Sequence, residues 1–175
     1  MELFDPGSVL GADPGEAVVH FLGTWGIRML LLSLMVSSVR RLTGKAHIIR
    51  YRRMIGLFAF AYLCSHFLAY LGFLVQFDWS LFLEDFTERP YITAGLAALL
   101  MLIPLALTST TGWQRRLRRN WQKLHRLVYG AALLGLLHAI WQTREGFGEV
   151  VLYSVVLAFL LGERIWYTLS LRRTG

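Results

Sequence analysis

The sequence predicts an all-α fold: a polytopic membrane helix bundle with five transmembrane helices, the N-terminus outside and the C-terminus inside. Apolar residues make up 55% of the 175 residues and charged residues only 17%, whereas about a quarter of a soluble domain is charged. The mean hydropathy is +0.49. The charged residues also gather in short segments between long apolar runs, as expected of a chain that crosses a bilayer several times.

Five apolar runs are long enough, or nearly long enough, to span a membrane. A bilayer core of about 30 Å needs roughly 20 apolar residues in a helix. The expected spans are residues 20–39, 54–75, 92–107, 124–141 and 150–169. No internal repeat stands out. We therefore expect one transmembrane domain, residues 20–171, between an external tail of residues 1–19 and a cytoplasmic tail of residues 172–175.

Lys and Arg are concentrated in alternate loops. Segment 40–53 holds six of them and segment 108–123 holds five, and neither segment contains an acid. Short loops rich in Lys and Arg stay in the cytoplasm, which places the N-terminus outside and the C-terminus inside. The formal charge of +7 is then a topology signal that contacts membrane lipid, and nucleic acid is excluded as a partner. The loop between the second and third spans carries acids instead: Asp78, Glu84, Asp85 and Glu88.

Several ionisable residues lie inside the expected spans, where they are costly and mark functional sites by default. Three histidines on two helices indicate imidazole chemistry, because neutral imidazole binds haem iron and an apolar bundle can enclose the porphyrin. Zinc would need a third or fourth ligand nearby, which Cys64 does not supply convincingly. The ionisable residues are Arg28, His66, His125, His138, Glu163 and Arg164.

The depths of the three histidines select a pair. At about 1.5 Å per residue, His66 lies roughly 20 Å from the cytoplasmic end of its helix, His125 about 9 Å and His138 about 28 Å. We therefore expect His66 and His138 to be the axial iron ligands of one haem near the outer face. An inner haem on His125 would need a ligand near residue 53, where the chain offers two arginines, or an unusual loop that brings in His47. One haem is thus supported and a second is left open.

The other polar residues have a structural and a functional interpretation. Arg28 either reaches the interface or partners a propionate of the outer haem, since a buried guanidinium requires a carboxylate. Glu163 and Arg164 lie near the cytoplasmic face, where snorkelling or a local ion pair is expected. His20 is expected to be structural at the outer interface, and Cys64 to be a small buried hydrophobe.

Short motifs make the sequence resemble a known family. In their order and spacing they resemble the MsrQ (YedZ) family, the haem-binding membrane subunits of bacterial protein-methionine-sulfoxide reductase systems, within the ferric-reductase-like transmembrane superfamily. The resemblance covers residues 10–172. The motifs are LGADP at 10–14, HFLG at 20–23, RRMIGLFAFAYLCSHFLAY at 52–70, RPYITAG at 89–95, LALTST at 105–110 and WQKLHRLVY at 121–129, with His138 thirteen residues after His125.

The resemblance implies a b-type cytochrome of the bacterial inner membrane, with one or two haem b groups and haem-related histidines at His66, His125 and His138. Such a subunit passes electrons from the quinone pool, or from a cytoplasmic flavin reductase, to a periplasmic molybdopterin reductase of the MsrP type. That partner carries the substrate-reducing site and repairs methionine sulfoxide in oxidised envelope proteins. FMN is also associated with the family.

The sequence departs from the family pattern at its beginning. Members usually carry a further hydrophobic helix before the LGADP motif, where this sequence has nine residues. No GxGxxG loop is present either. We therefore expect this chain to receive electrons from another carrier rather than from NAD(P)H.

Two other classes of protein stay open at this point. A small transporter or proton channel could use the three histidines as a proton relay. Transporters often show paired Gly or Pro interruptions near mid-membrane, whereas Pro104 is a single candidate. A membrane scaffold without a cofactor is the second class. A visible absorption spectrum of the purified protein distinguishes all three.

Overall fold

A computed structural model describes residues 13–143 and 148–173. These residues form helices joined by short turns and contain no strand, which confirms the predicted all-α class. Five helical segments are long and apolar enough to cross a membrane, as the sequence predicted. The side of the membrane on which each terminus lies stays a prediction. The five segments are Pro14–Thr43, Ala46–Leu74, Pro90–Leu107, Arg119–Gln142 and Gly148–Ser170.

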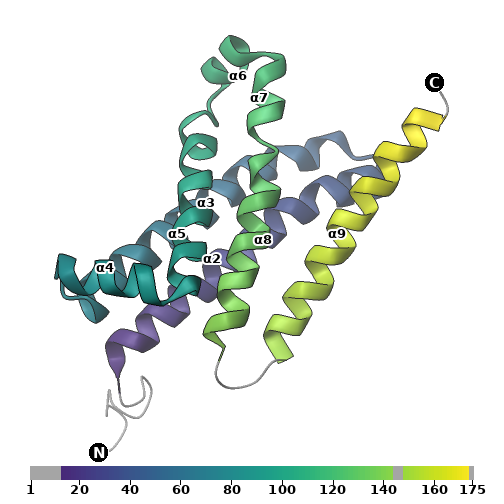
Figure 1. Cartoon of the computed structure of the whole chain (residues 1–175). Helices are drawn as coiled ribbons and strands as arrows, with labels where there is room; N and C mark the ends of the chain where they lie inside the picture. The colour runs from purple at the N-terminus through teal and green to yellow at the C-terminus, as the bar shows by residue number, and fades with distance from the viewer. Residues whose placement is uncertain (1–12, 144–147, 174–175) are drawn as a thin grey trace, which may run out of the picture.

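The first two spans form an antiparallel pair of helices, α2 (Pro14–Thr43) and α3 (Ile49–Ala69), shown in Figure 1. The Asp13 carboxylate caps the start of α2 by accepting hydrogen bonds from two free backbone amides, and Pro14 suits the first turn. The helix ends where Gly44 adopts a φ of 67°, a left-handed conformation that glycine adopts without a steric penalty. The helix is therefore longer at both ends than the predicted span of residues 20–39.

Small residues allow α2 and α3 to approach closely. A Cβ atom on Gly26 of α2 would lie 2.6 Å from Cδ2 of Leu63 on α3, so any larger residue there would force the Leu63 side chain to move. Ala59 of α3 is completely buried. In a bilayer, where lipid is as apolar as the core, this close packing is a main source of helix association.

The second and third spans are joined by a short amphipathic helix that the sequence analysis did not predict. α3 ends in one wider turn, η2 (Tyr70–Leu74), and a tight bend follows in which Gln76 and Phe77 have positive φ. Helix α4 (Trp79–Glu88) then begins at its N-cap, Asp78. The pKa of Asp78 lies below its ordinary value because the Ser80 hydroxyl and two backbone amides donate to its carboxylate.

The third and fourth spans form a second antiparallel pair, α5 (Pro90–Leu107) and α8 (Leu127–Gln142). Ala131 of α8 is completely buried, like Ala59 in the first pair. The connection contains two short helices, α6 (Thr111–Leu117) and α7 (Arg119–Leu124).

The predicted fourth span of residues 124–141 is therefore interrupted near its start. The α-helical structure breaks at His125 and Arg126, between α7 and α8. The indole nitrogen of Trp121 donates to the Thr108 carbonyl over 2.8 Å. This bond connects α7 to the end of α5, just before the interruption.

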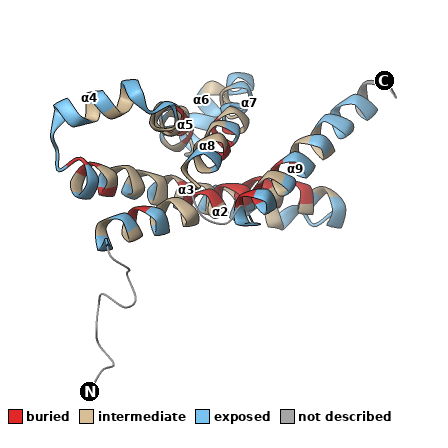
Figure 2. Ribbon diagram, turned by 60° about the horizontal axis from the view of Figure 1, so that its bottom comes forward, coloured by how far each residue is buried: buried red, intermediate tan, exposed pale blue. Residues whose placement is uncertain are grey.

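The last helix, α9 (Gly148–Arg173), packs on α2 and α8. Figure 2 shows that the buried residues lie along the middle of the bundle and that the outer surface is exposed. Large apolar side chains dominate much of this outer surface: Leu68, Leu133 and Phe159 are 60%, 51% and 64% exposed. Such a surface is suited to lipid, because water would penalise it.

Candidate haem site

The structure brings His66 and His138 together from the two helix pairs. His66 lies on α3 and His138 on α8. Their ring centroids are 6.0 Å apart and the ring planes are nearly perpendicular, at 78°. Depth along each helix had suggested this pairing, and the structure places the two imidazoles opposite each other.

A hydrogen bond from a neighbouring helix orients each imidazole. Nδ1 of His66 lies 2.9 Å from the Val19 carbonyl of α2, and Nδ1 of His138 lies 2.7 Å from the Tyr91 carbonyl of α5. Because a carbonyl oxygen only accepts, Nδ1 carries the proton in both rings. The lone pair is then on Nε2, the tautomer that metal-binding histidines adopt when the other nitrogen is held in this way.

A glycine packs against each ring, one helical turn after the carbonyl that holds it. A Cβ atom on Gly23 would lie 2.9 Å from Nδ1 of His66, and a Cβ atom on Gly95 would lie 2.8 Å from Nδ1 of His138. No larger residue fits at either position without displacing the imidazole. Both glycines are therefore part of the site.

These contacts form an internal repeat that the sequence analysis did not detect. In each helix pair the histidine lies 47 residues after the residue whose carbonyl it binds. The glycine occupies the same place in both pairs, and so does the fully buried alanine, Ala59 or Ala131. The glycine and the histidine are separated by the same number of residues in both helix pairs. This equal spacing was the signal in the sequence that could have revealed the repeat.

The pair suits a haem iron. Two imidazoles that each bind one metal ion through a nitrogen at about 2 Å have ring centroids about 6 Å apart, close to the separation in this structure. In the described part of the chain, no three His, Cys, Asp or Glu side chains gather into a metal site. Two histidines are the axial set for an iron whose other four ligands come from a porphyrin.

The structure places His125 apart from this pair. Its ring stacks on Trp121 with centroids 3.9 Å apart, and its Nδ1 lies 3.2 Å from the Trp121 carbonyl of the same helical segment. His47 is exposed in the short helix η1 (Ala46–Ile48), and His20 is exposed and lies 3.5 Å from Glu16. A role for His125 in binding haem stays a prediction.

Arg28 has protein partners in this structure. Its guanidinium donates to the Glu149 carboxylate over 3.0 Å and to the Tyr153 hydroxyl over 2.8 Å. These bonds connect α2 to the start of α9. If Arg28 binds a haem propionate as expected, its guanidinium must do so while it also binds Glu149 and Tyr153. This role of Arg28 stays a prediction.

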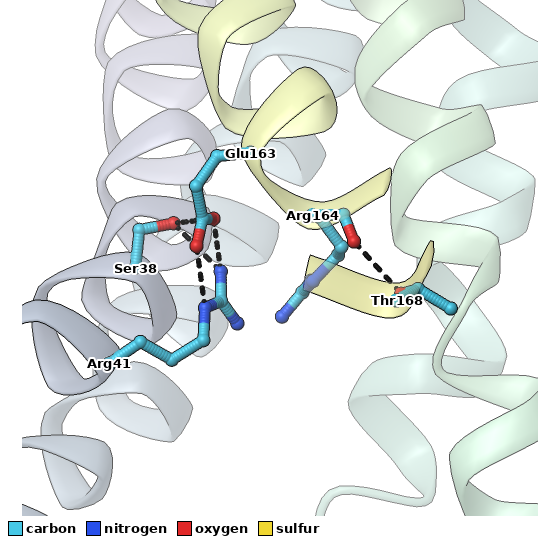
Figure 3. Close-up of polar contacts among 5 residues, drawn as sticks. All are labelled: Ser38, Arg41, Glu163, Arg164 and Thr168. Carbon is cyan, nitrogen blue, oxygen red and sulfur yellow. Dashed lines mark hydrogen bonds and ion pairs between the residues drawn. The ribbon is translucent and has the colours of Figure 1, made fainter. Parts of the chain in front are cut away.

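Glu163 forms a local ion pair, although not with its neighbour in the sequence. Figure 3 shows its carboxylate bound to Arg41 of α2. It also accepts a hydrogen bond from Ser38 over 2.9 Å. In Figure 3 the bonds to this carboxylate come from Arg41 and Ser38 and not from Arg164. The Arg164 guanidinium lies over the ring of Tyr129, 5.0 Å from the centroid.

Comparison with known proteins identifies the family. A family model described as the ferric reductase like transmembrane component matches residues 22–136. The protein-methionine-sulfoxide reductase heme-binding subunit MsrQ of Xanthomonas campestris pv. campestris (strain 8004) is 48% identical over 165 residues, which cover 94% of this chain and 76% of that protein. The subunit of the same name from Rhodospirillum rubrum is 46% identical over 170 residues, 97% of this chain and 82% of that protein. No solved structure matches the chain.

The matched region includes both glycines, Gly23 and Gly95, together with His66 and Tyr91, and ends just before His138. The relatives cover almost the whole chain. The chain therefore belongs to the MsrQ family of heme-binding membrane subunits, within the ferric-reductase-like transmembrane proteins.

Proposed function

We propose that this chain is the electron-transfer subunit of a protein-methionine-sulfoxide reductase system and binds haem b between α3 and α8. His66 and His138 would hold its iron. The observation that carries this proposal is their opposed position with both Nδ1 atoms held by backbone carbonyls. The bound haem supplies the one-electron chemistry, and the substrate-reducing site belongs to the partner.

The protein residues position the ligands and set their basicity. Carbonyl acceptors at Val19 and Tyr91 hold the Nδ1 proton of each imidazole, which would make each Nε2 a more basic ligand for the iron. Gly23 and Gly95 leave the space in which the two rings lie. The Tyr91 ring lies beside that of His138, with centroids 6.0 Å apart, and covers one side of the site.

A proton relay is less compatible with this arrangement. A relay needs imidazoles that exchange protons and reorient, whereas both Nδ1 protons here are committed to carbonyls on other helices. His125 lies on a different turn and stacks on Trp121. The described part of the chain thus favours a fixed ligand pair over a relay.

We further propose that the electrons move outward across a bacterial inner membrane. The donor is a quinol or a cytoplasmic flavin reductase, and the acceptor is a periplasmic molybdopterin reductase of the MsrP type. Helix α4 presents the exposed acids Glu84 and Glu88, while Asp85 is bound to Tyr70 and Arg89. The two free acids are suited to steering a basic partner surface. FMN stays an expectation from the family.

Reporter fusions test the orientation. Fusions at residue 45, at residue 116 and at the C-terminus are expected to report cytoplasm, and a fusion near Glu84 is expected to report the periplasm, because the Lys and Arg residues lie in the first three regions. An alkaline phosphatase and a fluorescent protein fused at each site give opposite readouts. A periplasmic signal at residue 116 would reverse the orientation and the direction of electron flow.

Re-oxidation of the haem tests the function. The purified protein reduced with dithionite is expected to be re-oxidised by the periplasmic reductase only while methionine sulfoxide is present. The double variant Glu84→Gln, Glu88→Gln should slow this step at low salt and leave the absorption spectrum unchanged, because charge governs the rate of encounter. Omitting methionine sulfoxide is the control. No re-oxidation with reductase and substrate both present would contradict the assignment.

A further inference from the structure

Helix α4 connects the two helix pairs that supply the candidate haem ligands. It lies between the end of α3 and the start of α5 (Figure 1). The ring of Phe82 on α4 meets that of Phe67, the residue after His66, with centroids 6.3 Å apart. On its other side, the Thr93 hydroxyl of α5 donates to the Phe86 carbonyl of α4 over 2.8 Å. The short helix is therefore bound to both pairs.

Asp85 is the polar centre of this connection. One of its carboxylate oxygens accepts a hydrogen bond from the Tyr70 hydroxyl over 2.7 Å, and the other lies 3.1 Å from Nε of Arg89. The Asp85 side chain is only 19% exposed, whereas Glu84 and Glu88 of the same helix are exposed. Both oxygens are therefore engaged, in charge-assisted hydrogen bonds that are stronger than neutral ones.

The two partners of this carboxylate lead to the two candidate ligands. Tyr70 lies one helical turn after His66, in the wider turn that ends α3. Arg89 is the N-cap of α5, and its guanidinium donates to the Tyr91 hydroxyl over 3.4 Å. The Tyr91 carbonyl lies 2.7 Å from Nδ1 of His138, and the Tyr91 ring lies beside the imidazole. The carboxylate is thus connected to the helix of one histidine and to the residue that orients the other.

We propose that Asp85 is a positioning residue of the candidate haem site: it fastens α4 to both helix pairs and thereby keeps the Tyr91 carbonyl on Nδ1 of His138. This inference rests on the proposed function, since groups that orient a histidine change how tightly it holds a metal. Asp85 acts through Tyr70 and Arg89. Among the described residues Arg89 forms an ion pair with this carboxylate alone, so its loss would release both partners at once.

The test compares variants of the full chain in lipid nanodiscs. Asp85→Ala removes both bonds, Asp85→Asn keeps an acceptor for Tyr70 without the charge that binds Arg89, and Asp85→Glu keeps the charge. Glu84→Gln is the matched control, since it removes the charge of the exposed neighbour.

Two measurements need no haem. Hydrogen exchange followed by mass spectrometry measures the local opening of α4. Nitrogen NMR of isotope-labelled histidine reports how much of His138 carries its proton on Nδ1. In the haem-loaded protein, haem titration gives the affinity, a redox titration gives the midpoint potential, and the low-spin EPR signal reports the orientation of the axial ligands.

In Asp85→Ala the α4 amides should exchange about tenfold faster than in wild type, because a charge-assisted bond is lost. The His138 ring should then populate both tautomers, haem should bind about tenfold more weakly, and the potential and EPR signal should shift. Asp85→Asn should lie between these limits, Asp85→Glu should recover most of the wild-type behaviour, and Glu84→Gln should match wild type.

Unchanged exchange of α4 in Asp85→Ala would overturn the inference. Faster exchange with unchanged His138 NMR and an unchanged potential would also overturn it, because Asp85 would then stabilise the fold without positioning the ligand. A wild-type protein that binds no haem would contradict the proposed function, whereas the exchange and NMR measurements would still decide whether Asp85 positions His138.

Discussion

Replacing His66 or His138 with alanine is expected to remove most of the bound haem and the low-spin bands that two axial imidazoles produce. Each variant leaves the iron with one protein ligand, and the remaining bond holds it weakly. Both variants should fail alike, because the two rings occupy equivalent places at the same 47-residue spacing. The measurement is the ratio of haem to protein, together with the oxidised and reduced absorption spectra.

Two further variants separate ligand loss from misfolding. His47→Ala changes an exposed histidine outside the site and should keep the full spectrum. His138→Gly with added imidazole should regain a low-spin spectrum if the cavity persists. His125→Ala should change the spectrum less than either ligand variant if there is a single haem. Full haem content in both His66→Ala and His138→Ala would disprove the ligand assignment.

Gly95→Ala is expected to lower haem affinity about tenfold, the effect of disturbing the group that orients a metal ligand. The new Cβ atom would lie 2.8 Å from Nδ1 and 3.2 Å from Cγ of His138. The ring cannot move away without losing its bond to the Tyr91 carbonyl. Haem titration of the apoprotein measures the affinity, and a redox titration should show a shifted potential.

Gly135→Ala is the matched control for this experiment. Gly135 lies on α8, the helix that carries His138, and a Cβ atom there would meet nothing within 4 Å. Alanine in place of glycine favours a helix by about 1 kcal/mol, so helix propensity alone would stabilise both variants. Gly23→Ala should match Gly95→Ala, since Gly23 packs on His66 in the same way. An unchanged affinity in both variants would show that the glycines are not part of the site.

The sequence alone determined that this chain crosses a membrane five times. Span length and apolar content are local properties, since the thickness of the bilayer sets them and not the contacts between helices. The depth of a residue along a helix is also local, because each residue adds a fixed rise. For that reason His66 and His138 could be paired before any packing was known, even though their estimated depths differed by several residues.

Predictions from local sequence patterns were less reliable where the helices are interrupted. The break at His125 follows a helix, α7, that is bonded to the end of α5 through Trp121 and Thr108, a contact that a search for apolar runs does not consider. Helix α4 is amphipathic and too short to span a bilayer, so a search for apolar runs does not detect it. Its capping residue, Asp78, followed by Ser80, was the available signal.

Tertiary packing alone decided how the site is built. Which carbonyl holds each imidazole depends on which turn of a neighbouring helix lies opposite, and this cannot be read from one helix. Gly23 and Gly95 are ordinary helix positions until a ring packs against them. The partner of Glu163 is Arg41, more than a hundred residues away in the chain, and not the adjacent Arg164, because the side chains of adjacent helical residues point in different directions. The sequence determines which residues each helix contains. Only the packing of the helices determines which of their side chains are in contact.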